Sequence, residues 1–502
     1  MAGAPAPAPN RTVPTAPGAG AVAWLGYVGG PGAAIAVWAA APATMPAAAA
    51  PVAGVAAWMA VWWLTAVVPL AATALLPLVV LPLAGAAAFE DVARRYADPI
   101  VFLFLGGFFL AAASERWGLH RRLAFGTIAL VGVEAPRVVL AVMAATAFLS
   151  MWISNTATAA LMLPLTVALV DLARREAPEQ AVAFGPALVL GMAYAASIGG
   201  VATLIGTPPT AIFAGAARAT LGRPIGFAEW LTVGLPIALL LLGACWLLLV
   251  RGVFRVRGPL GGLAALIERE RLRLGGWSVG ERATLAVLVA TALAWVLREP
   301  KAIGGLRVPG LADLWPGLSD AGIAIVAALV LFVLPTSRSA REFTLDWRSA
   351  ARIPWDVLLL FGGGLALAGA FDDSGLTPWL AQRLGVLGGL PPIVAIAGVT
   401  LFFVLLTELT SNTATAAMAM PIVAAVAPVI GAHPIPLMAA AALGSAMGFM
   451  LPVGTPPNAL AFGSGAVSAA QMRRAGLWLD LIGVVVITAV VGMWARGFAA
   501  TP

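Results

Sequence analysis

A run of seven residues occurs twice in this chain, and each copy interrupts a long apolar segment. Residues 154–160 and 411–417 both read Ser-Asn-Thr-Ala-Thr-Ala-Ala. Polar groups are costly in the interior of a bilayer, and those found there usually pair with a neighbour or serve a function. Two matching copies in an oily sequence therefore indicate one binding site that is built twice.

The apolar character of the chain places it in a membrane. Of its 502 residues, 61% are hydrophobic and only 10% are charged, whereas soluble domains carry about 25% charged residues. A bilayer-spanning helix needs about 20 mostly apolar residues. We therefore predict an all-α polytopic membrane protein with about 11 transmembrane helices. The candidate spans lie near 21–41, 50–66, 67–88, 99–115, 183–205, 231–250, 283–298, 320–335, 355–371, 435–453 and 477–496.

Two further apolar segments, 136–171 and 391–430, carry the repeated run near their middle. A polar centre fits a re-entrant helical hairpin better than one straight span. Non-helical backbone at membrane depth is tolerated where protein or a cavity surrounds it. The sequence thus predicts two re-entrant hairpins, each with a Ser-Asn-Thr at its tip.

The repeat extends beyond the two hairpins. Residues 104–107 (Phe-Leu-Gly-Gly) correspond to residues 361–364 (Phe-Gly-Gly-Gly), at the separation of 257 positions that also relates 154 to 411. Further on, Gly-Thr-Pro-Pro occurs at 206–209 and again at 454–457, with a separation of 248. Proline removes a backbone donor and disfavours helix at the preceding residue. Each Gly-Thr-Pro-Pro therefore predicts a broken helix.

The distribution of arginine predicts that the two copies are inverted repeats. Arg383 is the only arginine between residues 372 and 434, whereas six flank the first hairpin: Arg116, Arg121, Arg122, Arg137, Arg174 and Arg175. Basic residues mark cytoplasmic loops, so the first hairpin enters from the cytoplasm and the second from outside. The basic loops 251–282 and 338–352 are also expected in the cytoplasm. With eleven spans in the cell (inner) membrane, the N-terminus is then cytoplasmic and the C-terminus extracytoplasmic.

Composition also bears on the classes of function. The chain has two histidines, His120 and His433, and one cysteine, Cys245. An intramembrane enzyme needs a nucleophile with a base, or a metal cluster, and these residues supply neither, so we expect no enzymatic activity. The net charge of +7 is explained by cytoplasmic loops, and we expect no nucleic-acid partner. A passive channel is a further alternative, although inverted hairpins with broken helices favour alternating access.

Each hairpin tip has the chemistry to bind an anion. Ser, Thr and Asn are favoured helix N-caps, and a helix that begins there directs backbone N–H groups and its positive dipole end at the tip. Two tips that meet at the midplane can hold an anion with two carboxylates, or an anion together with cations. The alternative is that these side chains only join neighbouring helices.

Further oxygen atoms indicate cation binding. Carbonyl groups freed from the helix at each Gly-Thr-Pro-Pro can face a hard cation such as sodium. Ser150 and Thr407 each stand four residues before a tip, on the same helix face. They are either extra cation oxygens or hydroxyls bonded back to their own helix. Glu408 has Met151 at the matching position of the first copy, so it lies either at the outer mouth or in support of the tip.

These paired motifs resemble those of the divalent anion/sodium symporter family. The resemblance includes residues 68–70 (Val-Pro-Leu) and 73–77 (Thr-Ala-Leu-Leu-Pro) and covers about residues 50–497. It implies a homodimer in which a scaffold domain carries a transport domain that moves as an elevator. Members of the family carry succinate, malate, fumarate and related anions, mostly with sodium.

The resemblance divides the chain into six parts. A disordered tail (1–20) precedes scaffold helices (21–98), and the first half of the transport domain follows (99–230). Next come scaffold helices with basic cytoplasmic loops (231–354), the second half of the transport domain (355–470) and a C-terminal scaffold helix (471–502).

Site residues are carried over motif by motif. The resemblance implies substrate contacts from Ser154, Asn155, Thr156, Ser411, Asn412, Thr413, Thr455 and Pro456. It implies one sodium ion at Ser150, Ser154, Asn155 and the carbonyl region of Gly206, and another at Thr407, Ser411, Asn412 and the carbonyl region of Gly454. One departure is Thr210, because the second copy has Asn458 there and the family often has Asn in both.

We therefore predict a sodium-coupled symporter that imports C4-dicarboxylates with two or more co-transported sodium ions. The alternatives are a sodium-independent dicarboxylate exchanger, or a carrier of citrate or sulfate, on the same fold. The resemblance implies that some exchangers place cationic residues in the site. Arg, Lys and His are missing from both tips, which favours sodium coupling.

Overall fold

The computed structural model describes residues 19–498, apart from 133, 260–261, 263–267, 270–271, 304–305, 338–341 and 385–390. The predicted tail at 1–20 therefore lies almost wholly outside the described residues. The elements of the described chain are helices, apart from a short antiparallel pair of strands, β1 (Lys301–Ile303) and β2 (Leu306–Val308). The prediction of an all-α protein is confirmed.

The first repeat runs from a long helix through a helical hairpin to a broken helix. Its elements are α6 (Pro99–Arg116), α7 (Leu119–Val131), α8 (Ala135–Ser150), α9 (Asn155–Glu176), α10 (Pro178–Gly200) and α11 (Pro208–Leu221). The turn between α8 and α9 contains Ser154, and the break between α10 and α11 ends at Pro208. Both interruptions thus coincide with the first copies of the two sequence motifs.

The second repeat follows the same order. Its elements are α18 (Trp355–Asp373), α19 (Leu376–Leu384), α20 (Pro392–Thr407), α21 (Asn412–Val426), α22 (Pro434–Ser445) and α23 (Pro456–Gly463). Again the turn of the hairpin contains the Ser of the polar run, Ser411, and the break ends at the first proline of Gly-Thr-Pro-Pro, Pro456. The internal duplication read from the sequence is therefore a duplication of structure.

Other helices surround the two repeats. The N-terminal group is α1 (Ala19–Ala39), α2 (Ala49–Thr65), α3 (Leu70–Thr73), α4 (Leu76–Leu83) and α5 (Phe89–Tyr96). Between the repeats lie α12 (Phe227–Leu247), which continues as the π-helix η1 (Leu248–Val253), and α14 (Val279–Leu297), α15 (Leu311–Leu314), α16 (Asp320–Val333) and α17 (Trp347–Ala350). The last helix is α24 (Ala469–Ala495).

Two predicted spans have a different form. The span predicted at 435–453 is helical only as far as Ser445, where α22 ends. The segment 67–88 contains two short helices, α3 and α4, rather than one continuous helix. Pro69 precedes α3 and Pro77 stands in the first turn of α4, and proline is tolerated there but not in the middle of a helix. Seven of the described helices are long and apolar enough to cross a membrane alone, so the total of eleven spans stays a prediction.

Glycine lets the broken helices approach the hairpins closely. A methyl group on Gly199 of α10 would overlap the backbone of Ala147 in α8. In the second repeat, a methyl group on Gly444 of α22 would lie 2.8 Å from the Thr400 carbonyl oxygen of α20. Small residues at such crossings allow tight helix packing in membranes. Each broken helix is thereby held against the first arm of its own hairpin.

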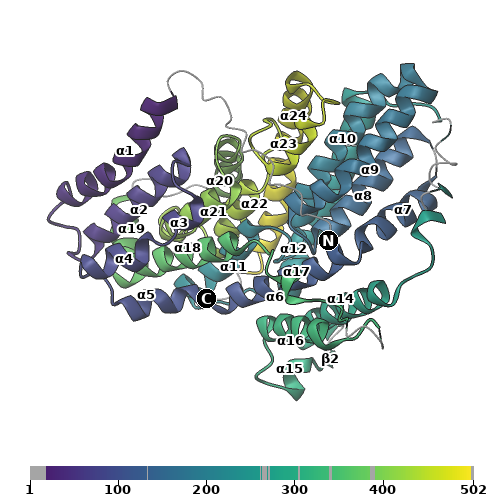
Figure 1. Ribbon diagram of the computed structural model, residues 1–502. Coiled ribbons are helices and arrows are strands. Elements are labelled where there is room, and N and C mark those ends of the chain that lie inside the picture. Colours follow the sequence, from purple (N-terminus) through teal and green to yellow (C-terminus); the bar gives the residue numbers. More distant parts are fainter. Residues whose placement is uncertain are drawn as a thin grey trace, which may run out of the picture.

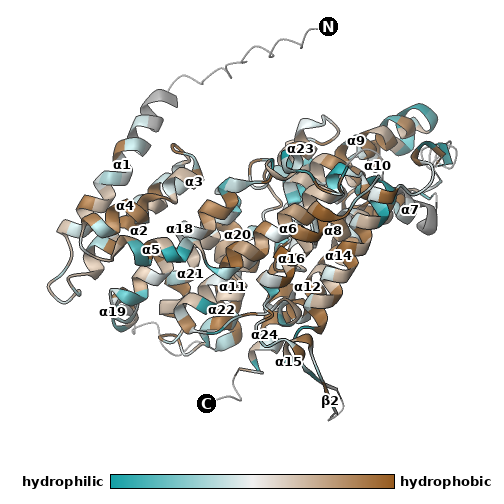
Figure 2. Cartoon of the chain, turned by 60° about the horizontal axis from the view of Figure 1, so that its bottom comes forward, coloured by the Kyte–Doolittle hydropathy of each residue, from teal (hydrophilic) through white to brown (hydrophobic). Residues whose placement is uncertain are grey.

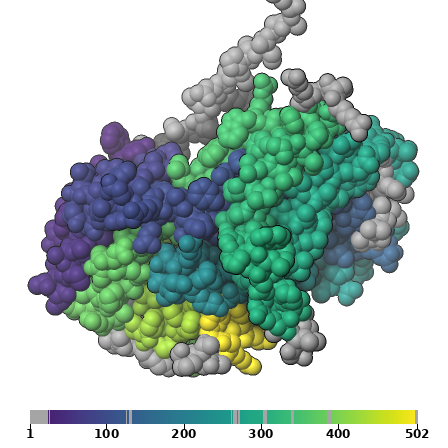
Figure 3. Space-filling view, turned by 90° about the horizontal axis from the view of Figure 1, so that it is seen from below, coloured from purple at the N-terminus to yellow at the C-terminus, as the bar shows by residue number. Residues whose placement is uncertain are grey.

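The helices form an elongated body, with α1, α2, α4 and α5 at one end and α7 to α10 of the first repeat at the other (Figure 1). Hydrophobic residues extend along α6, α8 and α16, and hydrophilic residues gather at helix ends and loops (Figure 2). From below, the green segment around α16 stands beside the dark blue N-terminal helices (Figure 3). The helices α12 and α24 pack against each other; α12 also packs against α8 and α10, and α24 against α20 and α22.

Candidate transport site

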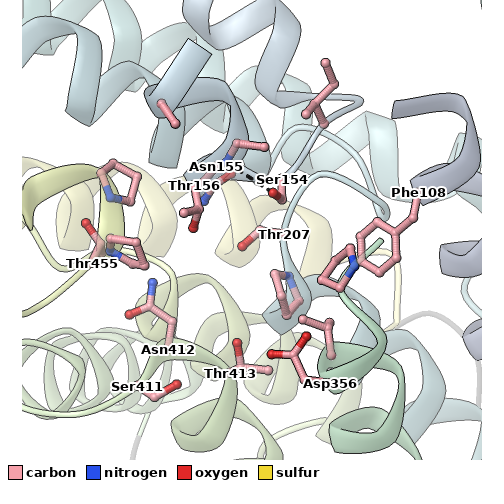
Figure 4. Close-up of a pocket in the computed structure, with 18 of the residues that line it drawn as sticks. Phe108, Ser154, Asn155, Thr156, Thr207, Asp356, Ser411, Asn412, Thr413 and Thr455 are labelled. Atoms are coloured by element: carbon pink, nitrogen blue, oxygen red, sulfur yellow. Dashed lines mark hydrogen bonds between the residues drawn. The ribbon is translucent and has the colours of Figure 1, made fainter. Parts of the chain in front are cut away.

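The two hairpin tips and the two helix breaks line one cavity of about 1300 Å³. Residues 153–157 and 409–413 line it from the tips, and residues 205–208 and 453–457 line it from the breaks. Apolar side chains of α2 and α6, among them Trp63 and Phe108, form another wall. The two Ser-Asn-Thr runs lie on opposite sides of this cavity, and Thr207 and Thr455 border the space that separates them (Figure 4).

Four helices direct their N-terminal ends at the cavity: α9, α11, α21 and α23. Their N-cap residues are Ser154, Thr207, Ser411 and Thr455, all of which line the cavity. Ser154 Oγ accepts a hydrogen bond from the Ala157 amide at 3.3 Å. Each helix N-terminus carries roughly half a positive charge. The cavity therefore attracts anions although its tips carry no basic side chain.

Oxygen-bearing groups converge beneath the first tip. The fully buried Ser150 hydroxyl donates to the Ala196 carbonyl oxygen at 2.6 Å. One terminal atom of the Asn155 amide lies 2.8 Å from Ser150 Oγ, 3.1 Å from Ala196 O and 3.3 Å from Gly206 O. With its nitrogen in that place, the amide satisfies these acceptors itself. With its oxygen there, it completes a set of four oxygens, the kind of donor set that hard cations prefer.

The second tip repeats this arrangement. The oxygen of the buried Thr407 hydroxyl lies 2.8 Å from the Ser445 carbonyl oxygen and 2.7 Å from Asn412 Oδ1, and its one hydrogen can donate to either acceptor. Ser445 is in α22 and Ala196 in α10, the two corresponding helices. The hydroxyls of Ser150 and Thr407 thus bond to a neighbouring element rather than back along their own helices. We name these two groups of oxygens the first cage (Ser150, Asn155, Ala196, Gly206) and the second cage (Thr407, Asn412, Ser445).

Different side chains tie the helix breaks to the tips in the two halves. In the first half, the Thr203 hydroxyl donates to the Met151 carbonyl oxygen at 2.6 Å and accepts from the Gly206 amide at 3.1 Å. In the second half, the Glu408 carboxylate accepts from the amides of Met450 at 2.7 Å and Leu451 at 2.9 Å. Glu408 is only 2% exposed, so it supports the tip and does not lie at an outer mouth.

The departure at Thr210 leaves its local role intact. Asn458 Nδ2 donates to the carbonyl oxygens of Gly448 at 3.0 Å and Leu451 at 3.1 Å. Thr210 Oγ1 lies 2.7 Å from the Thr207 carbonyl oxygen and 3.1 Å from that of Leu204. Both side chains therefore bind carbonyl groups of the loop that precedes their own helix.

Charged residues line the part of the cavity away from the tips: Glu115, Arg116, Arg352 and Asp356. Arg116 forms ion pairs with Glu342 at 3.2 Å and Asp346 at 2.8 Å. Arg352 is exposed, and no ion pair of its guanidinium occurs within the described chain. The Asp356 carboxylate points into the cavity near Thr413 (Figure 4). These four residues were not predicted to line the cavity, because the type of a charged residue near a helix end or in a loop does not show which way its side chain points.

The structure brings the expected site residues together. The ten that line the cavity are Ser154, Asn155, Thr156, Gly206, Ser411, Asn412, Thr413, Gly454, Thr455 and Pro456. Ser150 and Thr407 lie beneath it, fully buried. The carbonyl groups of Ala196 and Ser445 were not expected, because a backbone oxygen leaves no trace in residue identity. The buried Asp480 of α24 was also missed, although a carboxylate inside an apolar span is itself a signal.

Paired helical hairpins and broken helices that meet at one polar cavity define a class of protein, the multi-pass secondary transporters. Residues 33–499 match the family model described as the sodium:sulfate symporter transmembrane region. The chain therefore belongs to this family, the divalent anion/sodium symporters, and the family suggested by the sequence motifs is confirmed.

Curated relatives extend this similarity. The chain is 41% identical over 444 residues to the sodium-dependent dicarboxylate transporter SdcS of Staphylococcus aureus strain bovine RF122 / ET3-1, covering 86% of this chain and 84% of the relative. The SdcS protein of strain NCTC 8325 / PS 47 matches with the same identity and coverage. Among solved structures, the YdaH transporter of Alcanivorax borkumensis superposes with a TM-score of 0.52 at 17% identity, covering 82% of this chain and 88% of that one. At this identity the likeness concerns the fold alone.

Proposed function

We propose that this protein is a sodium-coupled symporter that imports C4-dicarboxylates such as succinate, malate and fumarate. The observation that carries the proposal is the convergence of four helix N-termini on one cavity, with an oxygen cage beneath each tip. Each tip offers hydroxyl, amide and backbone N–H donors to one carboxylate of a dianion. Relatives named as sodium-dependent dicarboxylate transporters support the same class of cargo.

Sodium and dicarboxylate are coupled through two asparagine amides. A cation in the first cage favours the orientation that presents the Asn155 oxygen to it, which turns the amide nitrogen towards the cavity. The nitrogen can then donate to a substrate carboxylate. Asn412 acts in the same way in the second cage, so two or more sodium ions accompany each dianion. The dianion binds best to a loaded site, which is coupling by differential affinity.

The movement is an elevator motion of a transport domain against a scaffold within a homodimer. Residues 99–230 and 355–470 supply most of the moving part. The helices α12 and α24 pack against the hairpins and broken helices. This packing supports assigning both helices to the transport domain and not to the scaffold, where they were predicted. Arg116 and Arg352 line the cavity and belong to segments expected in the cytoplasm, so the cavity faces the cytoplasm here.

Transport in proteoliposomes tests the site. Asn155→Ala and Asn412→Ala each remove the amide that joins a cage to the cavity, and each is expected to abolish sodium-dependent succinate uptake. Thr220→Ala is the matched control, because that half-buried hydroxyl bonds only to Ala216 of its own helix and should leave uptake unchanged. Near-normal uptake by either asparagine variant contradicts the site assignment.

The second candidate is a sodium-independent exchanger, or a carrier of citrate or sulfate. Arg352 in the cavity wall, which forms no ion pair with the residues that the structure describes, favours it, because a resident cation could replace sodium as the partner of a dianion. Counterflow of labelled succinate without sodium distinguishes the exchanger from the symporter. A thermal-shift panel of dicarboxylates, citrate and sulfate, each with sodium and with potassium, distinguishes the cargo.

A further inference from the structure

Two acidic side chains lie together in the interior, outside the cavity lining. Glu408 follows the last residue of α20 and is 2% exposed; Asp480 lies in α24 and is 3% exposed. The two carboxyl groups are within hydrogen-bonding reach of each other. Neither residue lines the cavity between the tips. The pair therefore joins the second hairpin to the last helix at a place separate from the substrate.

The two acidic groups differ in their partners. Both oxygens of Glu408 accept backbone hydrogen bonds, from Met450 and Leu451. Neither oxygen of Asp480 makes a well-formed hydrogen bond within the described chain, although the side chain is almost completely buried, with Glu408 and the Phe449 amide as neighbours. An ionised carboxylate in such a place needs compensation by positive charge.

No basic side chain supplies that compensation within the described residues. The group that α10 contributes nearby is Tyr194, whose hydroxyl oxygen lies 2.9 Å from the Phe449 carbonyl oxygen and 3.2 Å from that of Met472, with one hydrogen to donate to them. Cys245 of α12 lies beyond Tyr194. Tyrosine and cysteine in water are largely neutral at physiological pH. The arginines of α24, Arg473 and Arg474, are exposed at its beginning.

We propose that Glu408 and Asp480 form a binding site for one sodium ion, distinct from the first and second cages. The site goes beyond the proposed function, since it rests on burial and charge and not on the identity of the cargo. The oxygens of Asp480 supply the ligand atoms, and the Tyr194 oxygen is nearby. A cation there neutralises one of two adjacent buried charges.

The location gives this cation a role in the second half only. Glu408 holds the amides of the 446–455 loop, and that loop carries Gly454 and Thr455 to the cavity. When a cation compensates the negative charge of the Glu408–Asp480 pair, α20, the loop and α24 stay packed together. In the first half, Met151 replaces Glu408 and the Thr203 hydroxyl does the tying, so no third cation is needed there.

The test compares purified wild-type protein with Asp480→Asn, which keeps the shape of the side chain and removes its charge. Thermal melting is followed against sodium at constant ionic strength, with choline as the replacement, at pH 6, 7 and 8. Asp171→Asn is the matched control, because that exposed aspartate pairs only with Arg174 on the surface and should melt like the wild type. This readout needs no transport activity, so it stands if the proposed cargo fails.

If sodium binds there, Asp480→Asn loses at least about half of the sodium-dependent rise in melting temperature at every pH. Equal sodium dependence in variant and wild type overturns the proposal. Should Asp480→Asn not fold, Glu408→Gln is measured in the same way, with the same outcomes deciding.

Discussion

Thr407→Val removes one hydroxyl from the second cage with almost no change in side-chain volume. In the structure this hydroxyl is fully buried, and its oxygen lies 2.7 Å from Asn412 Oδ1 and 2.8 Å from the Ser445 carbonyl oxygen. Without sodium, the substitution removes the one hydrogen that these two acceptors share. The expected cost in folding free energy is about 1–3 kcal/mol.

Sodium binding should suffer by a comparable amount. A polar contact to a charged group contributes about 1.5–3 kcal/mol, so loss of one oxygen ligand weakens binding roughly 10- to 150-fold. Succinate uptake in proteoliposomes, measured against sodium with choline replacement, should show this as a rise in half-activating sodium. Uptake at saturating sodium and the apparent affinity for succinate should change less.

Thr407→Ser is the control, because it keeps the hydroxyl and copies Ser150 of the first cage. It should stay within about threefold of the wild type in half-activating sodium. If Thr407→Val also stays within that range, the hydroxyl is not a sodium ligand and the second cage is wrongly assigned. If Thr407→Ser loses as much sodium affinity as Thr407→Val, keeping the hydroxyl makes no difference and the loss is not that of an oxygen ligand.

Two further predictions concern groups outside the cages. Arg352→Gln should raise the KM for succinate about three- to tenfold when substrate enters from the cavity side, since a cation at the mouth steers dianions. The control is Arg348→Gln, because Arg348 is exposed and lies outside the cavity lining. Equal effects of the two substitutions would refute a local role for Arg352. His433 caps α22 through Nδ1, which accepts from the Ile435 amide at 3.2 Å, and burial first and Arg223 second lower its pKa. The stability that neutral His433 contributes is complete above its unfolded pKa of about 6.5 and is lost as pH falls towards the lower folded value. In His433→Asn the helix keeps an N-cap, and asparagine does not titrate. The melting temperature of this variant should therefore fall less than that of the wild type between pH 7.5 and 5. Parallel decreases in the two proteins would refute the role of the imidazole.

The architecture could be predicted because its determinants are written in residue types. Proline and N-capping residues set the breaks at Ser154 and Pro208 locally, and the duplicated copies at Ser411 and Pro456 repeat them. Proline also explains why the segment 67–88 is not one continuous span, since Pro69 and Pro77 divide it into α3 and α4. These features depend on neighbours in the sequence, and sequence patterns report such neighbours well.

The site was predictable only as far as side chains mark it. Ser150 and Asn155 were found because their polarity stands out in apolar sequence. Their carbonyl partner Ala196 was not, because its contribution depends on how α10 packs against α8. Asp480 was missed for a similar reason. Its partner, Glu408, lies 72 positions earlier in the chain (408 to 480), and only the packing of α24 against α20 brings the two together.

The exchange of roles between Thr203 and Glu408 bears on how a duplicated gene diverges. In one half a hydroxyl reaches from the loop to the hairpin, and in the other a carboxylate reaches from the hairpin to the loop. The two ancestral copies thus kept the same backbone connection while the residue responsible moved to the opposite partner. Divergence of this kind makes the halves non-interchangeable at the level of single residues. Selection could then adjust the ion preference of one half without disturbing the other.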